Sequence, residues 1–160
     1  MPLHNIEPLF DKDSRILILG SFPSVKSRQT KFFYGHPQNR FWKIIAAVYD
    51  EEVPESIADK KQLILRNHLA LWDVIESCDI TGSSDASIRN VKVNDLSRIL
   101  DRTAIEKICV NGKTAEKLYI RYLENRLARK AVYLPSSSPA NASYSFTELV
   151  KIWKSELRKN

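Results

Sequence analysis

Residues 15–42 read RILILGSFPSVKSRQTKFFYGHPQNRFW, and this stretch indicates how the rest of the chain is organised. Its first part, Arg15–Leu19, is a run of branched apolar residues that stops at Gly20, which is typical of a buried strand. Three later runs have the same character, at 69–75 (LALWDVI), 107–110 (KICV) and 131–134 (AVYL). Because their apolarity is continuous rather than alternating, we expect strands of a parallel sheet that is covered on both faces.

Segments with helical periodicity separate these strands. They are Phe41–Tyr49, Ile57–His68, Val93–Leu100, Thr114–Asn125 and Phe146–Leu157, and several begin near Asp, Ser or Thr. This alternation predicts an α/β fold, a three-layer α/β/α sandwich with a central four-stranded parallel sheet. The polar stretch Thr81–Ser87 has the size of a surface loop rather than a linker. We therefore expect residues 1–160 to form a single domain.

Composition narrows the class of protein. With 43% hydrophobic and 28% charged residues the chain is typical of globular proteins, and its net charge of +6 favours a polyanionic partner. Met1–Asn5 has no feature of a secretory signal, and no apolar run approaches the roughly 20 residues of a membrane helix. We expect a cytoplasmic protein without a membrane partner. Cys78, Cys109 and the scattered histidines show no metal-ligand spacing, so we expect no metal and no other cofactor.

The segment that follows the first strand is the main candidate site. Ligands bind beyond the carboxyl ends of parallel strands, and this connection far exceeds the usual length of about two to six residues. Its aromatic rings and positive charges suit stacking on a nucleobase and contact with phosphate. We expect Tyr34 to contact a ligand, whereas Phe32 and Phe33 could belong to the core. The candidate phosphate contacts are Lys26, Arg28 and Lys31, and a second basic group, Arg121, Arg126, Arg129 and Lys130, is interpreted as a solvated helix face.

Asn39 directly precedes a predicted helix. Asparagine is among the best N-cap residues, so a cap is the simpler interpretation from local sequence, and a catalytic role stays open beside it.

Three motifs resemble those of the uracil-DNA glycosylase superfamily. HPQNRFWK (36–43) resembles the HPxNRFWK signature of mismatch-specific uracil-DNA glycosylases, GSFPSVKS (20–27) the water-activating loop, and SSSPANAS (136–143) the minor-groove wedge loop. Where the superfamily directs water with Asp or Asn, this chain has Phe22, which cannot hydrogen-bond water. The pattern GSFPS…YGHPxNRFW is instead similar to that of the hypoxanthine-DNA glycosylases, the sixth family. Their HPxN asparagine is described as catalytic and corresponds to Asn39.

The resemblance implies a monofunctional DNA glycosylase of base excision repair, acting on deaminated bases in DNA with hypoxanthine preferred. Asn39 would position a water through its amide oxygen. Backbone N–H groups of the turn from Gly20 to Ser24 would stabilise the departing base. Tyr34, supported by Phe22, would stack on the flipped base. The expected substrate-binding residues are Gly20, Ser21, Phe22, Pro23, Ser24, Tyr34, His36 and Asp73, the last either accepting from a purine N–H or capping the next segment.

The wedge loop is the second expected DNA contact. Hydroxyls and free backbone N–H groups suit phosphate binding, and they are expected along Ser136, Ser137, Ser138, Pro139, Ala140 and Asn141, with Ala140 at the tip. We expect a monomer whose product passes to enzymes that process abasic sites. The alternatives are a uracil or mismatch-specific glycosylase and, because of Phe22, a non-catalytic binder of damaged DNA.

Overall fold

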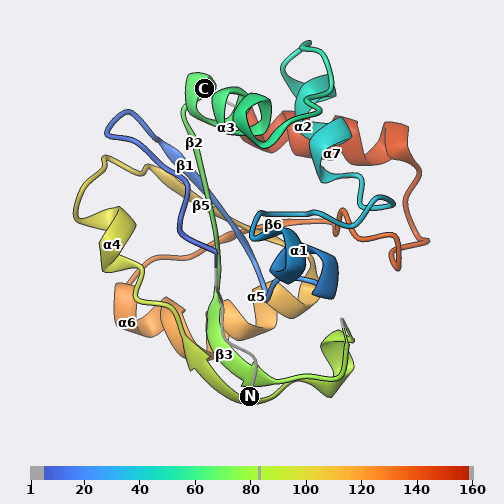
Figure 1. The fold of residues 1–160 in the computed structure, drawn as a ribbon. Coiled ribbons are helices and arrows are strands. Elements are labelled where there is room, and N and C mark those ends of the chain that lie inside the picture. Colours follow the sequence, from blue (N-terminus) through green and yellow to red (C-terminus); the bar gives the residue numbers. More distant parts are fainter. Residues whose placement is uncertain (1–5, 83, 159–160) are drawn as a thin grey trace.

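A central sheet of four parallel strands organises the computed structural model, which describes residues 6–82 and 84–158 (Figure 1). In spatial order the strands are β2 (Leu69–Asp73), β1 (Ile16–Gly20), β5 (Lys107–Asn111) and β6 (Val132–Leu134). Ile16 pairs with Leu69 on one side and with Lys107 on the other, so β1 lies inside the sheet. The four expected strands and the parallel sheet are confirmed, with shifts of one or two residues at their ends. Met1–Asn5, from which the absence of a signal was expected, lies outside the described residues.

Helices cover both faces of this sheet, which confirms the three-layer sandwich. On one face lie α2 (Phe41–Val48), α3 (Ile57–Arg66) and α7 (Phe146–Leu157), and on the other α4 (Ser97–Leu100), α5 (Lys113–Tyr119) and α6 (Asn125–Leu127) (Figure 1). A π-helical turn, Ile120–Glu124, joins α5 to α6, so the predicted helix 114–125 is one longer helical run. None of the helices in the described ranges is long and apolar enough to span a bilayer.

The apolar stripe expected on α2 is buried, and α2 packs on α7. Phe41, Ile44, Ile45 and Val48 are all fully buried, and the Phe41 ring meets Trp153 of α7 edge to face with their centroids 5.8 Å apart. Burying side chains of this size contributes about 1.5–3 kcal/mol each. The start of α2, where Asn39 stands, is therefore anchored to the core rather than to a loose loop.

One predicted helix is wrong over half of its length. Instead of a helix from Val93, the chain forms an antiparallel ribbon of β3 (Ile75–Asp79) and β4 (Arg89–Val93), with a 3-10 turn, η1 (Asp85–Ser87), between them. In the sequence, apolar residues 91 and 93 alternate with polar ones, which is the period of a strand. The helix begins only at Ser97, because the Asp95 carboxylate accepts from the Ser97 N–H at 3.0 Å. The run 69–75 is likewise corrected, since it is divided between β2 and β3.

The loop after β1 contains a helix that the sequence did not predict, α1 (Val25–Thr30). Ser24 caps it by accepting from the Ser27 N–H, and the buried Ser27 hydroxyl in turn accepts from the Gly35 N–H at 2.8 Å. These bonds give the long connection a defined path from the sheet to α2.

Candidate active site

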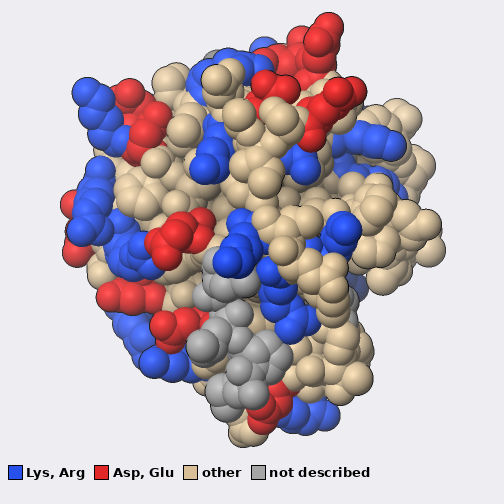
Figure 2. Space-filling model, in the orientation of Figure 1, with Lys and Arg blue, Asp and Glu red and all other residues tan. Residues whose placement is uncertain are grey.

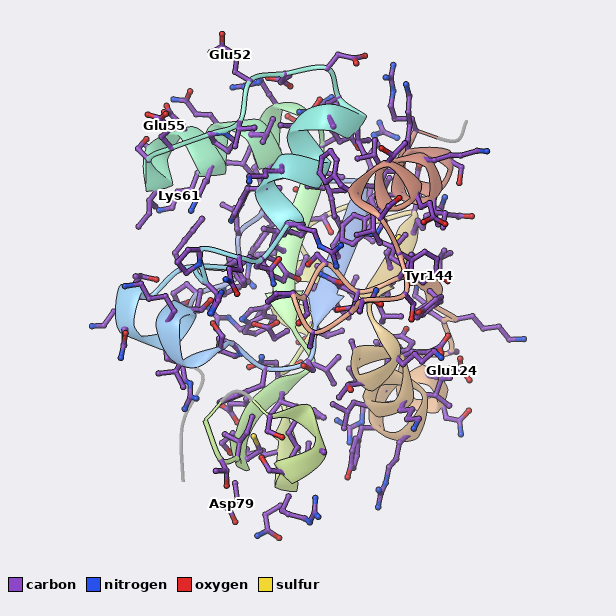
Figure 3. All side chains as sticks on the ribbon, turned by 90° about the vertical axis from the view of Figure 1, so that its right-hand side faces the viewer. Glu52, Glu55, Lys61, Asp79, Glu124 and Tyr144 are labelled. Carbon is purple, nitrogen blue, oxygen red and sulfur yellow. The ribbon has the colours of Figure 1, made fainter. Side chains whose placement is uncertain are left out.

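A cavity of about 300 Å³ opens at the carboxyl ends of β1, β2 and β5. Figure 3 views this side of the molecule, with Tyr144 labelled at the end of the wedge loop. The loops after β1 and β6, far apart in the sequence, meet around the cavity. The predicted residues that line it are Gly20, Ser21, Phe22, Pro23, Ser24, Tyr34, His36, Asn39, Asp73, Ser136, Ser137, Ser138, Pro139 and Ala140. Asn141 borders an adjacent hollow, whereas Lys26, Arg28 and Lys31 line neither.

Asn39 is held by two hydrogen bonds to its amide oxygen. Its Oδ1 accepts from the backbone N–H of Phe41, the first residue of α2, at 2.9 Å, and from the hydroxyl of Ser137 at 2.9 Å. The first bond satisfies an N–H that has no partner within the helix. The N-cap position itself is taken by Arg40, which makes no side-chain cap bond, so Asn39 caps α2 from one residue before that position. The second bond joins the start of α2 to the wedge loop.

Asn111, at the end of β5, determines the direction of this second bond. Its Oδ1 accepts from the Ser137 N–H at 3.0 Å, and its Nδ2 donates to the Ser137 hydroxyl oxygen at 3.0 Å. Since a backbone N–H can only donate, the Asn111 amide has one orientation, and the Ser137 proton is left to point at Asn39. Asn111 was not among the predicted site residues. Its position directly after the predicted strand 107–110, where ligands bind in parallel sheets, was the available signal.

The orientation of Asn39 bears on its predicted chemistry. An amide oxygen has two lone pairs, and those of Asn39 Oδ1 already serve Phe41 and Ser137, so it is not free to position a water. The amide nitrogen, by contrast, has no acceptor among the residues that the structure describes. Within the described residues Asn39 therefore has an unused hydrogen-bond donor and no unused acceptor, on a residue that lines the cavity.

Arg40, the next residue of the motif, holds the wedge loop. Its guanidinium donates to the carbonyls of Ser138, Asn141 and Tyr144 at 2.9–3.1 Å, and its N–H donates to the Ser137 carbonyl. Such charge-assisted bonds are stronger than neutral ones. The pair Asn-Arg thus explains why the HPxNR segment and the loop after β6 adopt one arrangement.

Within the wedge loop four of the N–H groups that were expected to be free are occupied. Those of Ser137, Ser138 and Ala140 donate to the side chains of Asn111, Ser136 and Ser138, and that of Asn141 closes a turn onto the Ser138 carbonyl at 3.0 Å. The loop uses these N–H groups for its own shape, so they are not free as expected, and the phosphate contact of this loop stays a prediction. Ala140 is exposed in the turn, which is compatible with a tip position.

Tyr34 and Asp73 form the opposite wall. Tyr34 adopts φ 51°, and its ring stacks on Phe41 with centroids 4.0 Å apart. Its buried hydroxyl has no well-formed hydrogen bond within the described chain. Burial, and after it the nearby Asp73 carboxylate, raise the pKa of Tyr34 far above its usual value, an effect that the Asn111 amide partly offsets. The phenol therefore stays neutral.

Gly20 is required by its closeness to Asp73. The Asp73 side chain is buried, with 4% of its surface exposed, and a Cβ atom on Gly20 would lie 2.3 Å from Asp73 Oδ1. Only glycine leaves room for this carboxylate at the cavity. The Asp73 carbonyl is fixed as well, because it accepts from the side chain of buried Asn94 at 2.9 Å.

The remaining aromatic residues divide between core and wall. Phe32 and Phe33 are buried, as the core interpretation held, and the Trp42 indole donates to the Phe33 carbonyl at 3.1 Å. Phe22 is 9% exposed and lies under the Arg28 guanidinium, whose carbon is 5.3 Å from the ring centroid.

The basic residues of α1 differ in availability. Arg28 donates to the carbonyls of Ser24 and Gly82, so its guanidinium has a structural task that the sequence did not indicate, whereas Lys26 and Lys31 are exposed. Arg121 and Arg126 are exposed on the helical run after β5, which agrees with a solvated helix face. On the face shown in Figure 2, Lys and Arg are interspersed with Asp and Glu and form no continuous stripe.

In residues 6–82 and 84–158, no three His, Cys, Asp or Glu side chains come together as a metal-binding group. Cys78 and Cys109 are buried and form no disulfide.

Comparison with known proteins identifies the family. The model of the uracil DNA glycosylase superfamily matches residues 7–157. This chain belongs to the uracil DNA glycosylase superfamily. Two curated superfamily relatives are named hypoxanthine DNA glycosylase. The one from Methanosarcina acetivorans is 33% identical over 86% of this chain and 87% of its own, and the one from Methanosarcina barkeri is 30% identical over 71% and 73%.

The superfamily fold is also found among solved structures. The solution NMR structure of a uracil DNA glycosylase candidate from Methanosarcina acetivorans has a TM-score of 0.81 and 30% identity, covering 96% of this chain and 94% of that one. The resemblance seen in the three motifs therefore extends over nearly the whole chain.

Proposed function

We propose that this protein is a monofunctional DNA glycosylase that removes deaminated bases, hypoxanthine in preference, by hydrolysing the N-glycosidic bond. The observation that carries the proposal is Asn39, whose amide oxygen is pinned at both lone pairs while its NH₂ group, on a side chain that lines the cavity, has no acceptor in the described residues. Membership of the superfamily and the names of the two relatives support the reaction type.

Hydrolysis breaks the bond between C1′ and the base nitrogen, and the electron pair leaves with the base. Water forms the new C1′–O bond, and its proton ends on the departed base. In this mechanism Asn39 Nδ2 donates to the base carbonyl oxygen, where negative charge accumulates as the bond breaks, so it acts as a preorganised electrostatic stabiliser. With Phe22 where relatives direct water, the rate would depend more on this stabilisation of the leaving group than on activating the nucleophile.

Base recognition follows from a pair of complementary groups. Deamination of adenine replaces an amino group and a ring acceptor by a carbonyl and a ring N–H. The Asn39 NH₂ group matches the new carbonyl, and the buried Asp73 carboxylate matches the new N–H. Adenine would instead place its amino group against the Asn39 NH₂ group and its ring nitrogen acceptor against the Asp73 carboxylate. Such unpaired polar contacts strongly disfavour binding. Guanine shares the carbonyl and the ring N–H of hypoxanthine, so we expect the cost of extruding it from a stable pair to exclude it.

The deciding experiment is base release from labelled duplexes. Duplexes that contain hypoxanthine, uracil or xanthine are incubated with the protein and then treated with alkali, which cleaves abasic strands. We expect cleavage with hypoxanthine to be fastest, and only after alkali. Strand cleavage without alkali would contradict a monofunctional enzyme, and faster release of uracil would favour the uracil-specific alternative.

A non-catalytic binder of damaged DNA is the second candidate, favoured by Phe22. Retention of a hypoxanthine duplex on the protein without any base release would support it. Under the main proposal the protein acts as a cytoplasmic monomer on DNA, and its abasic product passes to downstream repair enzymes.

A further inference from the structure

We propose that Ser137 and Asn111 are positioning residues that hold the Asn39 amide in its productive orientation and thereby make excision depend on the wedge loop. This inference rests on the proposed function, because it assigns how the donor of that function is oriented. Asn39 and Ser137 are 98 positions apart in the sequence, and Asn111 reaches the loop from a third element, β5.

The hydroxyl of Ser137 is the restraint that distinguishes the two ends of the Asn39 amide. The terminal torsion of asparagine is broad, so one hydrogen bond from the Phe41 N–H leaves the group considerable freedom. A second donor at 2.9 Å, on a side chain only 1% exposed, removes that freedom. If this donor is lost, the NH₂ group is no longer held toward one place in the cavity.

Asn111 ensures that the Ser137 proton is given to Asn39. A hydroxyl has a single proton, and the oxygen of Ser137 already accepts from Asn111 Nδ2. Asn111 sits at the end of β5, beside β1 inside the sheet, so its own position is rigid. The order of donors therefore runs from the sheet to the wedge loop and from there to the Asn39 amide.

Aspartate at position 111 would reverse this order with little change of shape. It keeps an acceptor for the Ser137 N–H but, when ionised, has no donor for the hydroxyl. The Ser137 proton would then turn to the carboxylate and leave Asn39 with one partner. Protonation of the carboxyl group restores a donor, so the defect of Asn111→Asp should diminish as the pH falls. A purely structural defect would not show this pH dependence.

The test measures single-turnover excision and DNA affinity on a hypoxanthine duplex. We expect Ser137→Ala and Asn111→Asp to lower the excision rate by about 10²-fold, the loss typical of displacing a reacting group by roughly 1 Å, with little change in Kd. Ser137→Cys, which keeps the size and a weak donor, should be intermediate. In an Asn39→Ala background neither change should lower the rate further. Equal losses with and without Asn39 would overturn the proposal, and so would a wild-type rate for Ser137→Ala.

Ser14→Ala is the matched control. Ser14 is also fully buried and makes two hydrogen bonds, donating to the Leu69 carbonyl and accepting from the Asp11 N–H, but it precedes β1 at the far end of the sheet. Loss of the Ser14 hydroxyl should lower the melting temperature about as much as Ser137→Ala does and leave excision intact. If the wild type excises and Asn39→Ala does not, while Ser137→Ala is fully active, this inference alone fails. If the wild type releases no base at all, the proposed function fails.

Discussion

Replacing Asn39 by aspartate or by alanine separates its capping role from its chemistry. Aspartate preserves an oxygen that can accept from the Phe41 N–H and the Ser137 hydroxyl, but it removes the NH₂ donor. Alanine removes both functions. The two variants should therefore differ in stability and agree in their loss of activity.

The stability change can be worked from the two bonds. Without its cap the start of α2 loses about 1 kcal/mol, and the buried Ser137 hydroxyl without its acceptor costs about 1 kcal/mol more, so Asn39→Ala should destabilise the fold by about 2 kcal/mol. For a chain of this size the melting temperature should fall by roughly 4–8 °C. Asn39→Asp should melt at or above the wild-type temperature, because a negative charge at a helix N-terminus is favourable.

The change in rate is larger than the change in stability. Loss of one preorganised donor to a developing anion typically costs about 10²–10³ in rate, which we expect for Asn39→Ala. Asn39→Asp should lose at least as much, since its charge also repels the departing base. The assay is single-turnover release of hypoxanthine, paired with thermal melting of each variant. Wild-type excision by Asn39→Asp would refute the reasoning, because it would show that the NH₂ group is not used.

Four further predictions concern the cavity, the DNA contacts and the independence from a cofactor. Gly20→Ala should reduce hypoxanthine release at least about tenfold, since a Cβ 2.3 Å from Asp73 Oδ1 must displace the carboxylate; an unchanged rate would remove Asp73 from base recognition. Lys26→Gln and Lys31→Gln should each flatten the dependence of log affinity on log salt by about 0.9, and an unaltered slope would place the DNA track elsewhere. Ala140→Leu should speed release from well-paired duplexes more than from mismatched or single strands, because it fills the space that the base vacates; equal effects would place Ala140 away from the tip. A chelator should leave excision unchanged, and loss of activity that added Mg²⁺ restores would disprove cofactor independence.

The sequence by itself determined the layers of the fold. Continuous apolar runs predicted the four parallel strands, and helical periodicity predicted α7 with the same bounds that the structure shows, Phe146–Leu157. These patterns are local, because each reports which faces of one element are buried. The same locality explains the failure at Val93–Leu100, where a strand and a short helix adjoin and the strand alternation at 91 and 93 covers too few residues to stand out.

Only the tertiary structure decided what Asn39 can do. The sequence left a cap and a catalyst as alternatives, and the fold shows a cap whose oxygen is doubly occupied and whose nitrogen is not. That result depends on Ser137 and on Asn111, which lie far from Asn39 along the chain and are brought to it by the sheet. A hydrogen-bond donor and acceptor carry no periodic signal, so their pairing across such separations is set by packing and cannot be deduced from one motif.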